Sequence, residues 1–290
     1  MSFKTLSKIA EICNSQKKEF WKVIIEDDAK ERGVTEEESF AQMTKMYRAM
    51  KNADADYDPN LRSASGLSGG DGAKLENFRK QSNRLIGDFL TEVMEKAVKM
   101  AENNACMKRI VAAPTAGSCG IIPAVLLTYE KQKNIPEEQI VKALFVAAGI
   151  GEVIAETACI AGSQGGCQAE IGSSSAMAAG ALSFLEGGTN EDILNSAALA
   201  LKNMLGLTCD PVAGLVEVPC IKRNVNGAIN AVVSSQMTKA GVKSAIPADE
   251  VIDSMGRIGK LLPACLRETG QDGLATTPTG LKILKKISRV

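Results

Sequence analysis

Residues 136–161 read PEEQIVKALFVAAGIGEVIAETACIA, and this stretch indicates the fold. Pro136 followed by two glutamates is a typical helix start, because proline fits the first turn and acidic side chains favour the positive end of the helix dipole. We expect this helix to run to about Ala161. Its centre, Ala143 to Gly151, is an uncharged apolar stretch of nine residues. That is too short to span a bilayer, so a buried helix is expected.

Charged side chains are distributed unevenly along the 290 residues. Residues 1–110 carry 37 of them, residues 111–220 carry 15, and residues 221–290 carry 16. The middle third is also rich in alanine, glycine and serine, which allow backbones to approach closely. We therefore expect it to form the interior. A charged N-terminal helical layer over residues 1–60 should cover a core formed by residues 61–290.

Helical spacing of apolar residues recurs along the chain, whereas the period-two alternation of strands is rare. Thr35, followed by three glutamates, predicts a capped helix start. Leu85 is expected on the buried face of a long helix. We predict an all-α fold, a single compact helical domain over residues 1–290 with a core rich in glycine, alanine and serine around the active site. The predicted helices cover residues 3–32, 35–52, 73–104, 136–161, 168–186, 190–205, 221–240 and 247–268, with another beginning near Gly120 and a Gly-rich loop over residues 53–72.

The composition excludes several classes of function. Lysine plus arginine and aspartate plus glutamate both number 34, and aromatic residues make up 4%. Nucleic acids and anionic membranes require a basic excess, so neither is an expected partner. The chain contains no histidine, which excludes Ser-His-Asp, Cys-His and histidine-ligated metal chemistry within it. The N-terminus lacks a signal-peptide pattern, so a cytoplasmic location with reduced cysteines is expected.

Three glycine-rich loops precede predicted helices, at residues 65–72, 114–120 and 162–167. Backbone N–H groups at helix starts can hold a carboxylate or a phosphate, so each loop is a candidate ligand cradle. For any one loop alone, a simple turn or helix cap is the commoner explanation. None has the spacing and strand context of a nucleotide-binding loop, so nucleotide binding is not expected.

The eight cysteines fall into two groups. Cys167, Cys209 and Cys220 lie at the ends of elements in the low-charge part of the chain, where they either point at one site or pack. The sequence has no C-x-x-C pair, so a zinc ribbon is not supported. Three thiolates without histidine suit an iron–sulfur cube with one open iron, which would act as a Lewis acid. Four others are expected to pack on helix faces, namely Cys13, Cys106, Cys159 and Cys265.

Long motifs of this chain match a known family over essentially its whole length. They are SGL at 65–67 with GGD at 69–71, AAPTAGSCGIIP at 112–123, GCQAEIG at 166–172, CDPVAG at 209–214, VPCIKRN at 218–224, RET at 267–269 and GLA at 273–275. The chain thereby resembles the alpha subunit of the two-subunit, iron–sulfur-dependent bacterial L-serine dehydratase (L-serine ammonia-lyase).

This resemblance implies an all-helical catalytic unit that carries a 4Fe-4S cluster and no pyridoxal phosphate. The three ligands map onto Cys167, Cys209 and Cys220, while Cys119 is expected to support or pack behind them. The implied reaction converts L-serine to pyruvate and ammonia through an aminoacrylate. The open iron would bind the serine hydroxyl and carboxylate while a base removes the α-proton.

The resemblance also points to a partner. Single-chain relatives carry a second, α/β domain that is absent here, so a separate beta subunit and a hetero-oligomer are expected. Some relatives end in a cysteine that binds the fourth iron. This chain ends in ISRV at residues 287–290. We therefore expect a fourth iron that is free for water or L-serine, unless the partner supplies a ligand.

The base remains open between a lysine, a serine alkoxide, Glu170 and a histidine of the partner, and we favour the partner. Glu170 follows Cys167 by three positions and should share a helix face with it, although a cap or salt-bridge role is an equal alternative. The candidate substrate-binding residues are Ser65, Gly69, Gly70, Thr115, Gly117, Ser118 and Asn224.

Three other functions stay open from the sequence. A related cluster-dependent L-cysteine desulfidase, or another β-eliminating lyase, would share the ligands and differ in the pocket. A pyridoxal-dependent lyase would need a lysine in its customary motif, which the chain does not show. A helical scaffold or ligand-binding subunit would use its cysteines only for packing.

Overall fold

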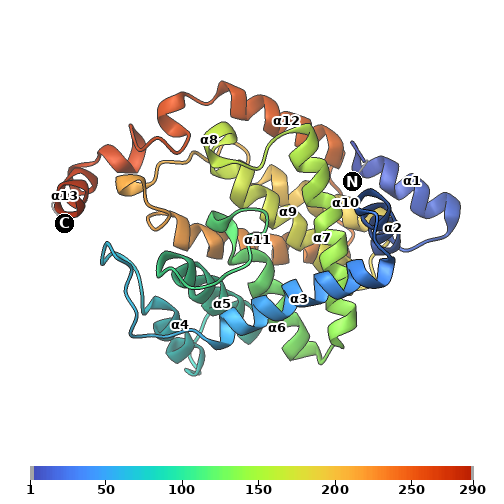
Figure 1. Ribbon diagram of the computed structural model, residues 1–290, viewed down its shortest axis with the longest axis horizontal. Helices are drawn as coiled ribbons and strands as arrows, with labels where there is room; N and C mark the ends of the chain where they lie inside the picture. The colour runs from blue at the N-terminus through green and yellow to red at the C-terminus, as the bar shows by residue number, and fades with distance from the viewer. Residues whose placement is uncertain (1–2, 289–290) are drawn as a thin grey trace.

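The computed structural model describes residues 3–288, and the predicted all-α fold is confirmed (Figure 1). No β-strand occurs among these residues; a single β-bridge joins Cys209 and Arg267. Residues 1–2 and 289–290, on which the expectations about the two chain ends partly rest, lie outside the described part. The α-helices are α1 (Leu6–Gln16), α2 (Phe20–Arg32), α3 (Glu36–Ala55), α4 (Asp71–Arg79), α5 (Asp88–Ala105), α6 (Ile121–Lys133), α7 (Glu137–Thr157), α8 (Gly162–Gly165), α9 (Ser173–Leu185), α10 (Asn190–Lys202), α11 (Cys220–Lys239), α12 (Ala248–Leu261) and α13 (Pro278–Ile287).

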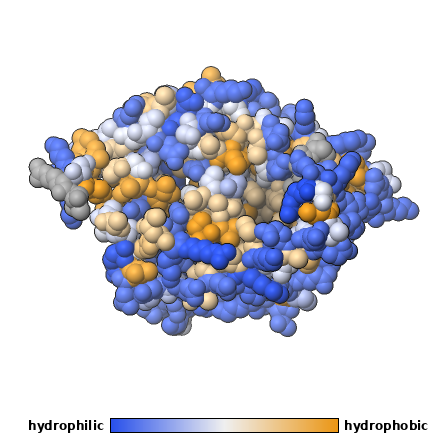
Figure 2. Space-filling model, viewed as in Figure 1, coloured by the Kyte–Doolittle hydropathy of each residue, from blue (hydrophilic) through white to orange (hydrophobic). Residues whose placement is uncertain are grey.

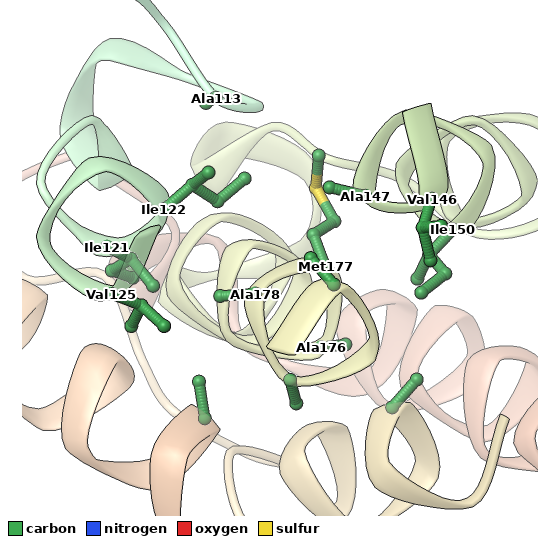
Figure 3. Close-up of a cluster of buried hydrophobic side chains, with 14 of the residues drawn as sticks. Ala113, Ile121, Ile122, Val125, Val146, Ala147, Ile150, Ala176, Met177 and Ala178 are labelled. Atoms are coloured by element: carbon green, nitrogen blue, oxygen red, sulfur yellow. The ribbon is translucent and has the colours of Figure 1, made fainter. Parts of the chain in front are cut away.

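Helix α9 lies in the middle of the fold and packs against α6, α7, α10 and α11 (Figure 1). All of its side chains over residues 173–183 are buried, and most are small; Met177 and Leu182 are the large ones. Figure 3 shows Met177 of α9 facing α7, with Ile150 nearby. A Cβ atom on Gly180 would lie 2.2 Å from Cδ1 of Ile150, so a larger residue there would force the Ile150 side chain to move. The small-residue middle third therefore forms the interior, as predicted.

Helices α2 and α3 pack on the outer side of α7, and α1 contacts α10 and α12. The start of α3 has the predicted cap: the Glu38 N–H donates to the Thr35 hydroxyl at 3.1 Å, and the Thr35 N–H donates to the Glu38 carboxylate at 2.8 Å. These bonds satisfy backbone donors that an uncapped helix leaves free.

Two helices predicted as continuous are interrupted. The predicted helix over 3–32 ends at Gln16, because Lys17 adopts a left-handed backbone with φ of 53°. The predicted helix over 73–104 is divided into α4 and α5 by residues 80–87. Leu85 lies in that connection and is 104% exposed, so its expected place in the core was wrong. Helical periodicity continues across both breaks, which is why the pattern did not reveal them.

The C-terminal part also differs from the prediction. The helix predicted over 247–268 ends at Leu261, because Pro263 disfavours a helical conformation at Leu262, whose backbone is extended. Helix α13 was not predicted. Its Leu281 and Leu284 are about two-fifths exposed, at 43% and 42%. In Figure 2, apolar side chains gather around this end of the chain and in the middle of the same face, between hydrophilic margins.

None of the helices between residues 3 and 288 combines the length and the apolar character that crossing a membrane would require.

Candidate active site

Three cysteines that are far apart in the sequence lie close together in the fold. Cys167 precedes a π-helical turn, Cys209 follows α10, and Cys220 is the first residue of α11. Their exposed fractions are 2%, 2% and 7%. The Sγ atoms of Cys167 and Cys209 and a carboxylate oxygen of Glu170 all lie within 4.8 Å of one another. The fold thus brings the three predicted ligand segments together and places Glu170 beside Cys167, as their spacing suggested.

The position and chemistry of the three sulfurs indicate which metal group they could bind. Cys220 does not belong to the group within 4.8 Å, so its Sγ lies farther than that from Cys167 or Cys209. Three buried thiols without a histidine are the kind of donors that hold iron–sulfur clusters, so the chemistry of the donor set fits such a group.

Backbone contacts hold the first two cysteines in place. The Gln168 N–H donates to the Leu207 carbonyl at 3.0 Å, which ties the segment of Cys167 to that of Cys209. The Cys209 N–H donates to Leu266 O at 2.8 Å, and its carbonyl accepts from the Glu268 N–H at 2.7 Å. The chain after α12 therefore fixes the position of Cys209.

Asn224 joins the third cysteine to the 114–120 loop. Its Nδ2 donates to Gly117 O at 2.7 Å and to Cys220 O at 3.0 Å, while its Oδ1 accepts from the Gly120 N–H at 2.8 Å. These bonds occupy the amide group, so Asn224 holds two loops together rather than offering free donors to a ligand.

Arg223 contacts the segments of all three cysteines. Its Nη1 donates to Cys167 Sγ at 3.1 Å and to Thr208 O at 2.7 Å. Its Nη2 donates to Asp210 Oδ1 at 3.0 Å. Cys220 lies three residues earlier on the same helix. A half-buried positive charge therefore stands next to the sulfur of Cys167.

The three thiols differ in how readily they ionise. The pKa of Cys167 is lowered, mainly because Cys209 donates a hydrogen bond to it and also because of the positive charge of Arg223. The same hydrogen bond, together with burial, raises the pKa of Cys209 far above its usual range. Burial raises the pKa of Cys220 to about 12. A coordinated thiol loses its proton, so a bound metal would reverse the last two shifts.

Glu170 lies between two glycines. Thr115 Oγ1 donates to Glu170 Oε1 at 2.7 Å. A Cβ on Gly117 would lie 3.1 Å from Oε1, and a Cβ on Gly162 would lie 2.7 Å from Oε2. The pKa of Glu170 is raised by burial and by the charge of Glu268. The backbone of Glu268 has φ of 65°, which a residue other than glycine seldom adopts.

Ser118 and Cys119 follow Thr115 in the same loop. The Ser118 hydroxyl lies 3.2 Å from the Thr115 hydroxyl and is fully buried. Cys119 is also fully buried, and its thiol points to Met100 O at 3.8 Å. Cys119 thus packs away from the three convergent sulfurs.

The first glycine-rich loop has its polar groups engaged within the chain. The N–H groups of Gly69, Asp71 and Gly72 donate to the buried Glu102 carboxylate at 3.2, 2.9 and 3.1 Å. The loop does cradle a carboxylate, but one that α5 supplies. Gly70 caps α4 with a left-handed φ of 83°.

The hydroxyls of the same loop are engaged as well. Ser65 donates to Glu217 at 2.8 Å, and Ser63 donates to the other oxygen of the same carboxylate at 2.7 Å. Since Glu217 precedes Cys220 by three residues, these bonds tie the loop to the third cysteine segment.

A separate hydrophobic cavity of about 660 Å³ lies among α5, α6, α9 and α11, with Tyr129 and Met237 in its walls. None of the predicted site residues lines it, and it holds no thiol. We therefore place the chemistry at the cysteines rather than in this cavity.

Sequence reasoning assigned no role to several residues of the site. Arg223 and Asp210 were quoted only as parts of motifs, although each is next to a cysteine segment. Glu268 was quoted in the tail without a function, and no local pattern brings it to Glu170. A charged residue in the low-charge region 111–220 was the signal that could have singled out Asp210, whereas Arg223 lies just beyond that region and had no such signal.

Comparisons with known proteins indicate one family. The family model described as "Serine dehydratase alpha chain" matches residues 15–275. The probable L-serine dehydratase alpha chain of Bacillus subtilis is 44% identical over 285 residues, which cover 98% of this chain and 95% of the relative. The L-serine dehydratase alpha chain of Peptoniphilus asaccharolyticus is 40% identical, covering 96% of each. An L-serine dehydratase of Helicobacter pylori is 33% identical, and the match covers 95% of this chain but 62% of that protein.

Proposed function

Since this chain belongs to the serine dehydratase alpha-chain family and is an L-serine ammonia-lyase, we propose that Cys167, Cys209 and Cys220 hold a 4Fe-4S cluster at which L-serine is deaminated to pyruvate and ammonia. The observation that carries this proposal is the convergence of three buried thiols from separate segments. Their chemistry, three thiols in a chain without histidine, supports an iron–sulfur group. When bound, such a cluster supplies a Lewis-acidic iron for the hydroxyl and carboxylate of L-serine.

The chain's own residues would shape the space beside the sulfurs. Gly117 and Gly162 leave room on both sides of the Glu170 carboxylate. Thr115 fixes one oxygen of that carboxylate, so the other is the atom available to exchange a proton with L-serine. We assign contact with L-serine to Thr115 and Gly117, and a supporting role to Ser118, whose hydroxyl is fully buried and engaged within the loop.

A second set of predicted residues supports this space from behind. Ser65, Gly69 and Asn224 have their polar groups engaged by Glu217, Glu102 and the 117–120 backbone. Gly70 provides the left-handed cap of α4. We assign these four residues to holding the loops in place, which fixes the positions of the cysteines and Glu170 relative to one another.

The base that removes the α-proton is assigned to a separate beta subunit. The chain has no histidine. Lys222, two residues after Cys220, is 60% exposed and paired with Asp71. A histidine has a pKa suited to proton abstraction near neutral pH. A hetero-oligomer in which the partner closes over the cysteines would complete the site.

The decisive experiment is iron and acid-labile sulfide content per chain, measured after anaerobic purification together with the beta subunit. The same sample is assayed for pyruvate formation from L-serine, with L-threonine and L-cysteine as competitors. We expect iron and sulfide in the amounts of a 4Fe-4S cluster, activity that is lost in air, and little activity from the isolated chain. A colourless yet fully active preparation would rule out the cluster, and robust turnover without a partner would rule out the imported base.

A further inference from the structure

We propose that Arg223 is the positioning residue of the cluster: it locks the three ligand segments together and holds a positive charge against one ligand sulfur. This inference rests on the proposed function. One guanidinium group spans the site, with Nη1 at 3.1 Å from Cys167 Sγ and 2.7 Å from Thr208 O. The third segment needs no bond, because Arg223 and Cys220 lie on the same turn of α11.

The pair that Arg223 forms with Asp210 is nearly closed to solvent, with side-chain exposures of 16% and 8%. Asp210 is itself held from the other side, since its Oδ2 accepts from the Leu274 N–H at 2.9 Å. Gly273 leaves the space for this contact, because a Cβ there would lie 2.6 Å from Oδ2. Loss of either Arg223 or Asp210 would leave the charge of the other buried and unpaired. The positions of the two side chains therefore depend strongly on each other.

The shape of the guanidinium explains why an arginine stands here. Three acceptors of different kinds, a sulfur, a carbonyl and a carboxylate, are reached by two nitrogens of one planar fork. A lysine ammonium is a point charge on a flexible stem and would not hold all three at once. Lys222, the neighbouring residue, instead points outward and pairs with Asp71 at 2.7 Å.

The contact with Cys167 has an electronic consequence as well. Hydrogen bonds to ligand sulfurs and nearby charge set the reduction potential of iron–sulfur clusters. A donor bond and a full positive charge both favour the electron-rich, reduced state. Arg223 should therefore give the cluster a higher reduction potential than an uncharged residue would. It should also slow the loss of iron in air, because a cluster of higher potential is harder to oxidise.

The test uses the holoenzyme with its beta subunit and compares Arg223→Gln and Arg223→Lys with wild type. The matched control is Lys222→Gln, which removes a positive charge one position away. Reduction potential is measured by spectroelectrochemistry, and iron retention as the half-life of bound iron in air. We expect Arg223→Gln to lower the potential and to shorten the half-life about tenfold, the lower end of effects from loss of a hydrogen bond to a metal ligand. Arg223→Lys should fall between, and Lys222→Gln should match wild type.

A variant Arg223→Gln with the potential and iron half-life of wild type would overturn the inference. Should that variant fail to fold, the result rests on Arg223→Lys and Asp210→Asn, which keep most of the buried contacts; wild-type values in both would overturn it equally. Wild-type enzyme without iron and sulfide would instead reject the proposed function, so the two failures are distinguishable.

Discussion

The hydroxyl of Thr115 donates a 2.7 Å hydrogen bond to Oε1 of Glu170, and no other hydrogen bond to this carboxylate occurs among residues 3–288. The bond joins the 114–120 loop to the turn that follows Cys167. A single hydroxyl thus orients the one carboxylate that lies beside two of the convergent thiols.

Replacement of Thr115 by valine should raise the pKa of Glu170 further. The hydroxyl stabilises the ionised carboxylate and partly offsets the effect of burial. The titration of Glu170 in the metal-free protein can be followed by carbon NMR of labelled glutamate. Thr115→Ser retains the donor and should titrate like wild type; an unchanged titration in Thr115→Val would contradict the prediction.

Replacement of Glu170 by glutamine should change how stability depends on pH. Burial and the charge of Glu268 raise the pKa of Glu170 above its ordinary value of 4.5. A carboxyl of this kind contributes stability that is fully present below its unfolded-state pKa and is lost as pH rises through its folded-state pKa. The free energy of unfolding of the metal-free wild type should therefore fall relative to Glu170→Gln as pH rises above 4.5.

Urea unfolding of wild type and Glu170→Gln at pH values below and above this window measures the effect. The control is Glu11→Gln, at an exposed glutamate paired with Lys8 on the surface of α1. Parallel stability curves for wild type and Glu170→Gln would show that Glu170 ionises normally.

Replacement of Gly162 by alanine should reduce turnover of L-serine without loss of iron. The new methyl group would lie 2.7 Å from Glu170 Oε2 and would displace that carboxylate. A misplacement of about 1 Å at a group that contacts the substrate can cost about 100-fold in rate. Gly87→Ala is the matched control, because a Cβ there meets nothing within 4 Å. Normal kcat/KM in Gly162→Ala would show that the position of Glu170 is unimportant.

Replacement of Cys167, Cys209 or Cys220 by serine should abolish loading of iron and sulfide. Each substitution removes one of the three thiolates that the cluster requires. Cys13→Ser is the control, because Cys13 is 1% exposed, like the ligands, but belongs to α1 and the apolar core. Iron analysis after anaerobic purification is the measurement. Retention of both iron and turnover in Cys220→Ser would disprove the ligand assignment.

Replacement of Glu102 by glutamine should destabilise the protein by about 2 kcal/mol, the scale of hydrogen bonds to a charged group. The carboxylate accepts three backbone N–H groups of residues 69–72 and the Tyr57 hydroxyl, and it is 1% exposed. Urea unfolding gives the free energy, and limited proteolysis reports on the 65–72 loop. A stability loss no larger than that of Glu11→Gln would show that the loop does not depend on Glu102.

The helical class followed from the sequence because it depends on local patterns. Apolar spacing, the Thr35 cap and the acidic start after Pro136 are properties of neighbouring residues, and each is found in the structure. The breaks at Lys17 and at residues 80–87 were missed for the same reason. Periodicity reports which face of a helix is apolar, whereas a break depends on how two segments must turn to pack.

In the candidate site, too, local patterns predicted some residues, whereas others depend on how the chain packs. The cysteines stood out through their position at element ends and through the family motifs. Glu268 did not stand out in the sequence. It comes near Glu170 only because the segment after α12 forms backbone hydrogen bonds with Cys209. The carboxylate cradle at residues 65–72 was recognisable as a cradle, but only the fold shows that Glu102 fills it.

The sequence by itself determined that this protein is helical, that its uncharged middle is the interior, and that no histidine of its own can take part in the chemistry. Those properties are fixed by composition and by short-range spacing. The tertiary structure decided how three cysteine segments, separated by 42 and 11 positions, come together, and that one arginine reaches all three of them. Contacts of this kind arise from how helices pack, and the packing minimises exposed apolar surface over the whole chain rather than over any one stretch.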